Sequence, residues 1–302
     1  MIREIQFFPL STRVDPWGGA VSNEVRDNPG TGRNSLRMSG CRHVLVLVHG
    51  FNNSQEKAEE SYALFYSRLE GHFRRSNLAP DAVAFFHWPG NYAMARFDAA
   101  AWYHVDIERA RESAKLFAEY LSGFDDPESL RVTLVGHSLG CRLILLTLKN
   151  LRGPRIPKID IVSLMAPAIP VDLLSQLNDP DLEDDDLSLT VQAPRRILKF
   201  FSKRDWALSA GFPLGQQAAY QRKIEKRHYR EAVGLNGSPA SVGIPFETNN
   251  GHSDYWGDVR TTNELGRLLD PAFHSLPQPH RISGWVMESA QPIESHRISD
   301  RT

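Results

Sequence analysis

The sequence predicts an α/β protein in which a doubly wound, mostly parallel sheet is flanked by helices. Two observations lead to this prediction. Continuous apolar runs rich in β-branched residues recur along the chain, and such runs are typical of strands buried on both faces of a parallel sheet. Amphipathic stretches with helical spacing separate the runs, and this alternation favours right-handed crossovers between parallel strands.

Five of these runs are expected to form the central strands. They are "HVLVLV" (43–48), "AVAFFHW" (82–88), "RVTLV" (131–135), "IDIVSLM" (159–165) and "RRILKFF" (195–201). The earlier segment "EIQFFPL" is expected to form a short edge strand, because Pro9 cannot donate a hydrogen bond to a neighbouring strand. Residues 11–40 are rich in Gly, Asn, Arg and Ser and are expected to be irregular.

Three helices are expected between the strands. In 54–73 and in 98–122, apolar side chains recur at steps of three and four residues. Asn53 is the expected N-cap of the first of these helices. The third helix, 139–151, follows Ser138 directly.

These elements divide the chain into three regions. Residues 1–40 are expected to hold the N-terminal edge strand and an irregular arm, residues 41–270 the α/β domain, and residues 271–302 an irregular, polar tail. An acidic run at 179–186 and a basic run at 221–230, the latter with helix-like character, are both expected to be solvated surface.

Composition excludes several classes of function. The 302 residues include 35 Lys and Arg against 36 Asp and Glu, so no overall basic field indicates nucleic acid or a membrane surface as partner. No apolar run approaches the roughly 20 residues of a membrane span, and no signal peptide is expected. Two cysteines are too few for a disulfide framework. We expect a cytoplasmic protein that acts on a small molecule, and the oligomeric state stays open.

The most informative motif is "GHSLG", a G-x-S-x-G pattern at residues 136–140. It lies between a predicted buried strand and a predicted helix, the context of a nucleophile elbow. Gly136 and Gly140 would let strand and helix pack closely, and Ser138 would stand at a helix N-terminus, which favours negative charge. The alternative is a simple N-cap serine, which accounts for Ser138 but not for both glycines.

A serine nucleophile needs a base, and the base needs an orienting acid. In α/β sheets with this motif the chain order is serine, acid, histidine. Asp205 follows the predicted strand 195–201 and is the expected acid, although a helix N-cap role is also open. His252 lies among loop-forming residues in "ETNNGHSDYW" and is the expected base. His137 is expected only to pack, and His228 to lie on the surface.

The expected oxyanion hole consists of two backbone N–H groups. One belongs to Leu139, directly after the serine. The other belongs to Phe51 in "LVLVHGFNNS", where Gly50 allows the turn and His49 is expected to brace the loop rather than act as a base. The expected substrate-binding residues are Trp88, Tyr92 and Trp206. For the aromatic segment 88–104, packing of a helix on the sheet is the alternative.

Six segments together resemble the α/β-hydrolase superfamily. They are "VLVLVHGFNNS", "HWPG", "VTLVGHSLGCRLIL", "DIVSLMAPAIPVDLL", "FFSKRDWALSAG" and "GHSDYW". In particular they resemble a bacterial, esterase/lipase-like branch catalogued as a domain of unknown function, over about residues 41–270. The resemblance implies a nucleophile at Ser138, an acid at Asp205, a base at His252 and oxyanion donors at Phe51 and Leu139. Where relatives often carry an aspartate, this chain has Ala168, with Asp172 the nearest carboxylate.

Two hypotheses of different classes follow. The first is a serine hydrolase that cleaves carboxylic esters or thioesters, without metal or cofactor, since H-E-x-x-H, C-x-x-C and G-x-G-x-x-G motifs are all missing from the sequence. The second is a catalytically silent binding or scaffold protein on the same fold. A metal-dependent phosphodiesterase built on "DLEDDD" (181–186) is a third and weaker alternative, because no histidine accompanies the run.

Overall fold

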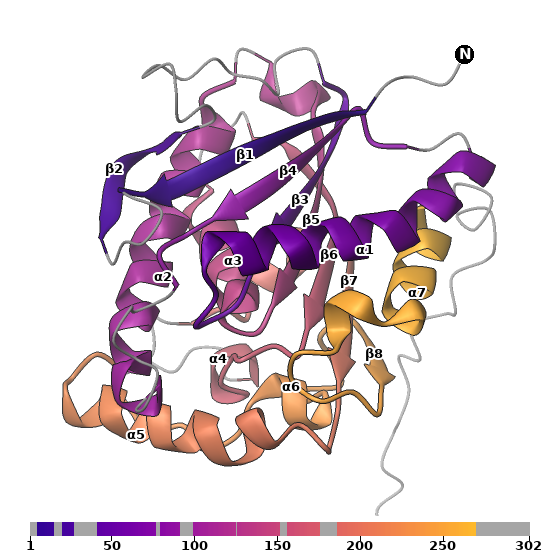
Figure 1. The fold of residues 1–302 in the computed structure, drawn as a ribbon. Helices are drawn as coiled ribbons and strands as arrows, with labels where there is room; N and C mark the ends of the chain where they lie inside the picture. The colour runs from indigo at the N-terminus through magenta and orange to yellow at the C-terminus, as the bar shows by residue number, and fades with distance from the viewer. Residues whose placement is uncertain are drawn as a thin grey trace, which may run out of the picture.

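A computed structural model describes residues 5–14, 20–26, 41–76, 79–90, 99–124, 126–151, 156–175 and 186–269 (Figure 1). Within them the strands are β1 (Gln6–Arg13), β2 (Val21–Arg26), β3 (His43–Val48), β4 (Ala82–His87), β5 (Arg131–His137), β6 (Lys158–Met165), β7 (Arg196–Phe201) and β8 (Ile244–Glu247). They form one sheet in the order β2-β1-β4-β3-β5-β6-β7-β8. Only β2 runs antiparallel to its neighbour. The predicted fold class is confirmed.

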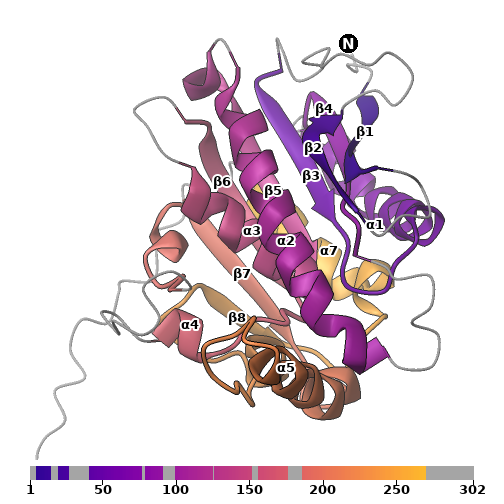
Figure 2. The same ribbon diagram turned by 90° about the vertical axis from the view of Figure 1, so that its left-hand side faces the viewer.

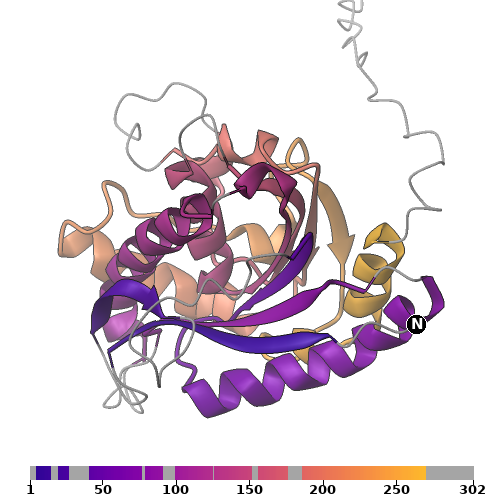
Figure 3. The ribbon, with the colours of Figure 1, turned by 90° about the horizontal axis from the view of Figure 1, so that it is seen from above.

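Helices cover both faces of this sheet. The longer ones are α1 (Gln55–Ser76), α2 (Ala99–Ser122), α3 (Leu139–Asn150), α5 (Phe212–Gln221) and α7 (Val259–Leu269). Short elements are α4 (Asp172–Ser175), α6 (Val233–Asn236), the 3-10 turns η1 (Pro127–Ser129), η3 (Thr190–Gln192) and η5 (Tyr255–Gly257), and the π-helical η4 (Ala207–Gly211). Figures 2 and 3 show α2 and α3 on one face, and α1 and α7 on the other.

The helices form where the spacing of apolar residues predicts them. Every apolar residue of the predicted stripes on α1 and α2 is buried: Ala58, Tyr62, Phe65, Leu69, Phe73, Ile107, Ala110, Ala114, Phe117 and Leu121. Burial of one such large side chain stabilises the fold by about 1.5–3 kcal/mol.

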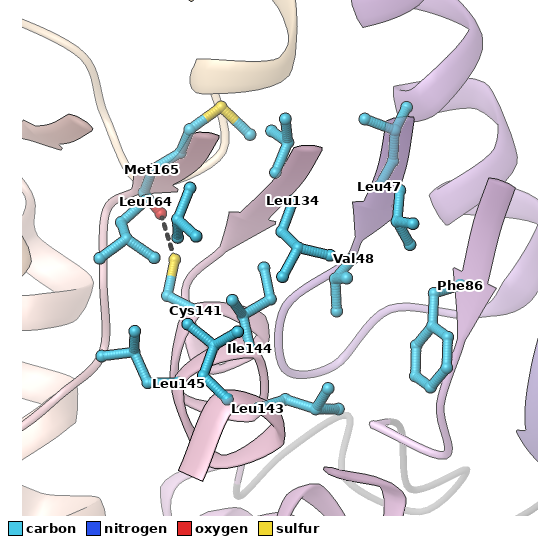
Figure 4. Packing of buried hydrophobic residues seen from close by; sticks show 14 of the residues in the cluster. Leu47, Val48, Phe86, Leu134, Cys141, Leu143, Ile144, Leu145, Leu164 and Met165 are labelled. Atoms are coloured by element: carbon cyan, nitrogen blue, oxygen red, sulfur yellow. Dashed lines mark hydrogen bonds between the residues drawn. The ribbon is translucent and has the colours of Figure 1, made fainter. Parts of the chain in front are cut away.

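Helix α3 is buried from its first residue, because the sheet lies on one side of it and α2 on the other. Figure 4 shows Leu143 and Ile144 of α3 among the core side chains near Leu134 of β5. The thiol of Cys141 donates to the carbonyl of Met165 at the end of β6, at 3.4 Å. These contacts fix where α3 begins, and therefore where Ser138 stands.

The expectation of an N-terminal edge strand was wrong. β1 pairs in parallel with β4 from Gln6 to Ser11 and also pairs with β2, at Ser11 and Arg13. It is therefore an inner strand. Pro9 lies before the part of β1 that pairs with β2, so its missing N–H removes no hydrogen bond from that ladder. β2 itself arises within 11–40, which was expected to be irregular throughout.

Two further differences lie near the carboxyl half. The basic run 221–230, expected to be helix-like, forms turns, bends and irregular chain after Gln221. The edge strand β8 was not predicted, because it has only four residues, contains Pro245 and is mostly exposed. The expected tail 271–302 lies outside the described residues. In the part of the chain that the structure describes, no helix has the length and apolar character needed to cross a membrane.

Candidate active site

The candidate site lies where strands end. In a parallel sheet the carboxyl ends of the strands meet at one edge, so the segments that follow them come together. Ser138 follows β5, Asp205 follows β7, and His252 follows β8, the last strand of the sheet. The topology therefore gathers residues that are far apart in sequence.

The structure brings the three predicted side chains into one hydrogen-bonded chain. Ser138 Oγ lies 2.9 Å from His252 Nε2, and His252 Nδ1 lies 2.8 Å from Asp205 Oδ2. Asp205 is fully buried, whereas the side chain of His252 keeps 21% of its surface exposed. An imidazole in this position can take a proton from the hydroxyl while its other nitrogen is held by the carboxylate.

Ser138 sits on a strained turn. Its backbone has φ 53° and ψ −123°, in a region that residues other than glycine rarely adopt. Its N–H donates to Met165 O at 2.9 Å, and its carbonyl accepts the N–H groups of Cys141 and Ala168. The side chain makes no capping hydrogen bond to α3. The simple N-cap interpretation of Ser138 therefore does not apply.

The loop after β3 packs directly against this turn. A Cβ atom added to Gly50 would lie 2.7 Å from Ser138 Cβ and 2.9 Å from His137 Nδ1. A Cβ added to Gly140 would collide with the carbonyl oxygen of His49. Only glycine at both positions allows so close an approach. The segment that carries Phe51 is thereby held beside Ser138.

The N–H groups of Phe51 and Leu139 are available as donors. Within the described ranges, the N–H of Phe51, which lies in a turn, donates to no protein acceptor, and that of Leu139 donates to none outside α3. Leu139 is the first residue of α3, where the helix leaves its N–H groups without intrahelical acceptors. Leu139 follows Ser138 in the chain, and Phe51 follows Gly50, which packs against Ser138; that the two N–H groups form an oxyanion hole stays a prediction.

The carboxylate of Asp205 uses both of its oxygens. Oδ1 accepts the backbone N–H of Leu208 at 3.0 Å, while Oδ2 faces His252. The helix-capping role and the orienting role, which the sequence left open as alternatives, thus coexist. The cap fixes the rotation of the carboxylate toward the imidazole.

His137 does more than pack. Its Nε2 lies 2.6 Å from the carbonyl oxygen of His252 and donates to it, and the two ring centroids are 4.9 Å apart. This bond ties the loop after β8 to the turn after β5. No sequence signal distinguished this role, because it depends on which loop folds over the turn.

His49 is held at every polar atom. Its N–H donates to Tyr62 Oη at 2.6 Å, its carbonyl accepts the indole N–H of Trp88 at 2.8 Å, and its Nδ1 donates to Gly50 O at 2.8 Å. Arg13 Nη2 lies 3.3 Å from Nε2 and donates to it. Both ring nitrogens are therefore occupied, and His49 braces the loop, as its sequence context predicted.

Comparison with protein families identifies the chain. A model of a family described as α/β hydrolases of unknown function, DUF900, matches residues 31–242. The chain belongs to the DUF900 family. The matched region includes Ser138 and Asp205 and ends before His252, so β8, α7 and the histidine loop lie beyond it.

Several solved structures are similar to this DUF900 chain at low identity. TT1662 from Thermus thermophilus is 16% identical, with 78% of this chain and 90% of that chain covered and a TM-score of 0.42. An esterase from Pyrobaculum calidifontis is 16% identical, with 77% of each chain covered and a TM-score of 0.37. The esterase Pf2001 from Pyrococcus furiosus is 14% identical, with 78% and 82% covered and a TM-score of 0.37. Among the curated proteins, none matches the chain.

The three residues expected to bind substrate in this DUF900 protein have different surroundings. Trp88 is fully buried and stacks on His49, with ring centroids 5.5 Å apart, so it supports the loop and exposes no surface to a substrate. Tyr92 lies outside the described residues. Trp206, next to Asp205, is 72% exposed. Tyr103 of α2, which belongs to the aromatic segment 88–104, meets the ring of Phe51 edge-on, with ring centroids 5.5 Å apart.

Other features of the DUF900 chain lie away from the site. A groove of about 770 Å³ is lined by the first residues of β5 and β6 and by Leu148 of α3, at the amino end of the sheet. Among the residues described, no group of three or more His, Cys, Asp or Glu side chains could hold a metal ion. The acidic run proposed as a metal site lies outside the described residues except for Asp186.

Three buried histidines make the fold of this DUF900 protein sensitive to acid. His49, His87 and His137 stand at the ends of neighbouring strands. Burial lowers the pKa of His87 and of His137 to about 3, and that of His49 well below its ordinary value of 6.5. Each ring therefore binds a proton more readily in the unfolded chain than in the folded one.

The stability contributed by these neutral rings is complete above pH 6.5 and is lost as the pH falls below it. With up to three protons taken up by these rings on unfolding, their contribution should lower the free energy of unfolding by as much as about 4 kcal/mol per pH unit. His43, whose pKa burial lowers to about 4, adds to this slope. Urea titrations at several pH values between about 8 and 5 measure this slope. A flat profile over that range, checked for reversibility, would contradict buried neutral histidines.

Proposed function

We propose that this DUF900 protein is a serine hydrolase that cleaves carboxylic esters or thioesters through an acyl-enzyme. The observation that carries the proposal is the hydrogen-bonded chain from Ser138 through His252 to Asp205. In it each nitrogen of the imidazole has one partner, so the tautomer is defined: Nδ1 carries the proton and Nε2 accepts from the hydroxyl. Membership in a family of α/β hydrolases supports hydrolase activity in general, without specifying the substrate.

The reaction begins with attack of Ser138 Oγ on the carbonyl carbon of the substrate. His252 Nε2 takes the hydroxyl proton as the new C–O bond forms. When the tetrahedral intermediate collapses, the bond to the leaving group breaks, and His252 returns the proton to the departing alcohol or thiol. Water then attacks the acyl-enzyme with His252 again as base. This second step releases the acid and restores Ser138.

Asp205 stabilises the imidazolium that forms in each step. Its carboxylate is fully buried and is held by the N–H of Leu208, so it does not need to reorganise when His252 becomes charged. A buried, preoriented carboxylate interacts more strongly with the charged ring than a hydrated one does. Its role is orientation and charge stabilisation, without proton transfer to the substrate.

The negative oxygen of the intermediate needs donors that are already in place. The N–H groups of Phe51 and Leu139 flank Ser138 and are free of other acceptors in the described part of the chain. Leu139 also begins α3, whose dipole favours negative charge at that point. Tyr103, behind Phe51, is a candidate wall for the acyl group.

Labelling with a fluorophosphonate tests this proposal against the catalytically silent alternative. The reagent phosphonylates a serine only when a base activates it. We expect wild-type protein to be labelled at Ser138, and the Ser138→Ala and His252→Ala variants to remain unlabelled. Ser253→Ala, which changes an exposed serine in the histidine loop, is the matched control and should label like wild type. Folded wild-type protein that takes no label would instead favour the scaffold alternative.

A further inference from the structure

The segment from Trp206 to Gln221, which forms η4 and α5, has an outer surface without charge. None of its 16 residues is Asp, Glu, Lys or Arg. Three large side chains are exposed: Trp206 by 72%, Leu214 by 64% and Tyr220 by 46%. A helix on the surface of a globular protein ordinarily shows water a charged or polar face. This helical segment instead shows water these three large side chains, and its exposed polar residues, Ser209 and Gln221, are uncharged.

The inner face of the same segment packs against the core. Leu208, Phe212, Gln216 and Ala219 are buried and recur at steps of three and four residues. The exposed apolar residues therefore do not belong to the core, and the rotation of the helix is fixed by its buried side. Nothing in this packing accounts for Leu214 or Trp206 on the outside.

Basic residues stand at both ends of this uncharged segment. Lys203 and Arg204 precede it, and after it come Arg222, Lys223, Lys226, Arg227 and Arg230. Between residues 203 and 230 there are only two carboxylates, Asp205 and Glu225, and both are buried. Asp205 faces His252, and Glu225 pairs with Arg142 and Arg111. All exposed charge of 203–230 is therefore positive, although Lys203 also pairs with Glu247 at 3.0 Å.

We propose that η4 and α5 dock this protein onto the surface of an anionic lipid bilayer. An uncharged helix with exposed Trp, Leu and Tyr, flanked by Lys and Arg, is complementary to such a surface in two ways. Its apolar side chains can enter the boundary between headgroups and acyl chains, and its cations attract the anionic headgroups. A helical segment of 16 residues is about 24 Å long, so the basic clusters contact the bilayer on either side of the inserted residues.

Docking through α5 would also place the candidate active site close to the bilayer. α5 lies at one end of the molecule, at the lower edge in Figures 1 and 2. The carboxyl end of β7 points to this end of the molecule, because Asp205 follows β7 and directly precedes Trp206, where the segment begins. A docked protein would hold Ser138 and His252 near the bilayer, where amphiphilic esters collect. The docking itself does not depend on the proposed hydrolase activity.

Flotation with lipid vesicles tests the proposal. The probe is phosphatidylcholine vesicles with phosphatidylglycerol as the anionic component, compared with vesicles of phosphatidylcholine alone. We expect the full-length protein to float with the anionic vesicles only. Leu214→Asp should lower the partition coefficient about tenfold. The double variant Arg222→Glu/Lys223→Glu should lower it at least about 25-fold, because each cation removed costs about fivefold in binding. The Ser138→Ala protein should float like wild type, which separates this test from that of the hydrolase proposal.

The matched controls lie on α1, on the other face of the sheet (Figure 3). Leu64 is 45% exposed there, and Lys57 and Arg68 are exposed cations. Leu64→Asp, and Lys57→Glu with Arg68→Glu, should leave flotation unchanged. Wild type that stays unbound, or controls that lose as much binding as the α5 variants, would overturn the proposal. A third result would also overturn it: wild type binds no vesicles, and light scattering shows a wild-type dimer that Leu214→Asp converts into a monomer. The exposed apolar side chains would then belong to a dimer interface.

Discussion

Replacement of Ser138 by alanine is expected to lower kcat for a p-nitrophenyl ester by about six orders of magnitude. The alanine keeps the backbone of the turn and the packing of Gly50 against it, but it removes the only atom that can form the acyl-enzyme. His252→Ala should have a loss of similar size, because without the base the hydroxyl is a weak nucleophile. Steady-state kinetics measure the loss, and urea denaturation checks that the variants are folded.

Ser253→Ala is the control for this result, because Ser253 is exposed beside the histidine and should leave kcat within about twofold of wild type. If Ser138→Ala retained substantial, saturable turnover that a second purification did not remove, Ser138 would not be the nucleophile. The serine would then have only the structural role of occupying the turn.

Asp205→Asn is expected to lower kcat by about four orders of magnitude, less than the loss of the nucleophile or the base. The asparagine side chain can keep the bond from Leu208 N–H, so the helix cap and the fold should survive. Its amide cannot stabilise the imidazolium, and the NH₂ group turned toward His252 would favour the wrong tautomer. Kinetics on folded protein, with the same ester, give the measurement.

Two other carboxylates are controls for Asp205. Asp172 begins α4 and is the carboxylate nearest in sequence to Ala168. Asp254 follows His252 and accepts Gly251 N–H at 2.8 Å. Asp172→Asn and Asp254→Asn should remain active. Near-normal activity of Asp205→Asn together with an inactive Asp172 or Asp254 variant would transfer the role of the acid to that residue.

The five central strands, β3 to β7, could be predicted because they are buried on both faces, which leaves an uninterrupted apolar run in the sequence. β1 and β2 could not be placed in the same way. Whether a strand lies inside a sheet or at its edge depends on its partners, and the partner of β1 comes from a segment without an apolar run. Pro9 was a misleading signal, because it lies outside the ladder with β2.

The candidate site was more predictable than the edge of the sheet. Ser138 and Asp205 each follow a predicted strand and His252 lies among loop-forming residues, which are local properties of the sequence. The topology then brings the three side chains together. The supports of the site were not predictable. Arg13 reaches His49, and His137 reaches the carbonyl of His252, through contacts between segments 36 and 115 residues apart.

The basic run 221–230 shows that the net charge of a whole chain does not reveal a local, positively charged surface. The net charge of −1 gives no indication of a membrane surface. The carboxylates within 203–230 are buried in pairs with His252, Arg111 and Arg142, however, so they do not neutralise the exposed cations. Only the fold separates the charges that face water from those that do not.

The backbone of Ser138 has a consequence for how this lineage can change. A serine held at φ 53° and ψ −123° costs about 1–3 kcal/mol, and glycine would relieve that cost. Under the proposed function, selection for the nucleophile is what keeps a side chain there. Descendants that lose the chemistry but keep the fold should therefore drift toward glycine at this position, while Gly50 and Gly140 persist because the packing still requires them. A glycine in place of this serine then marks a branch of the family that has lost the hydrolase activity and gained stability of the fold.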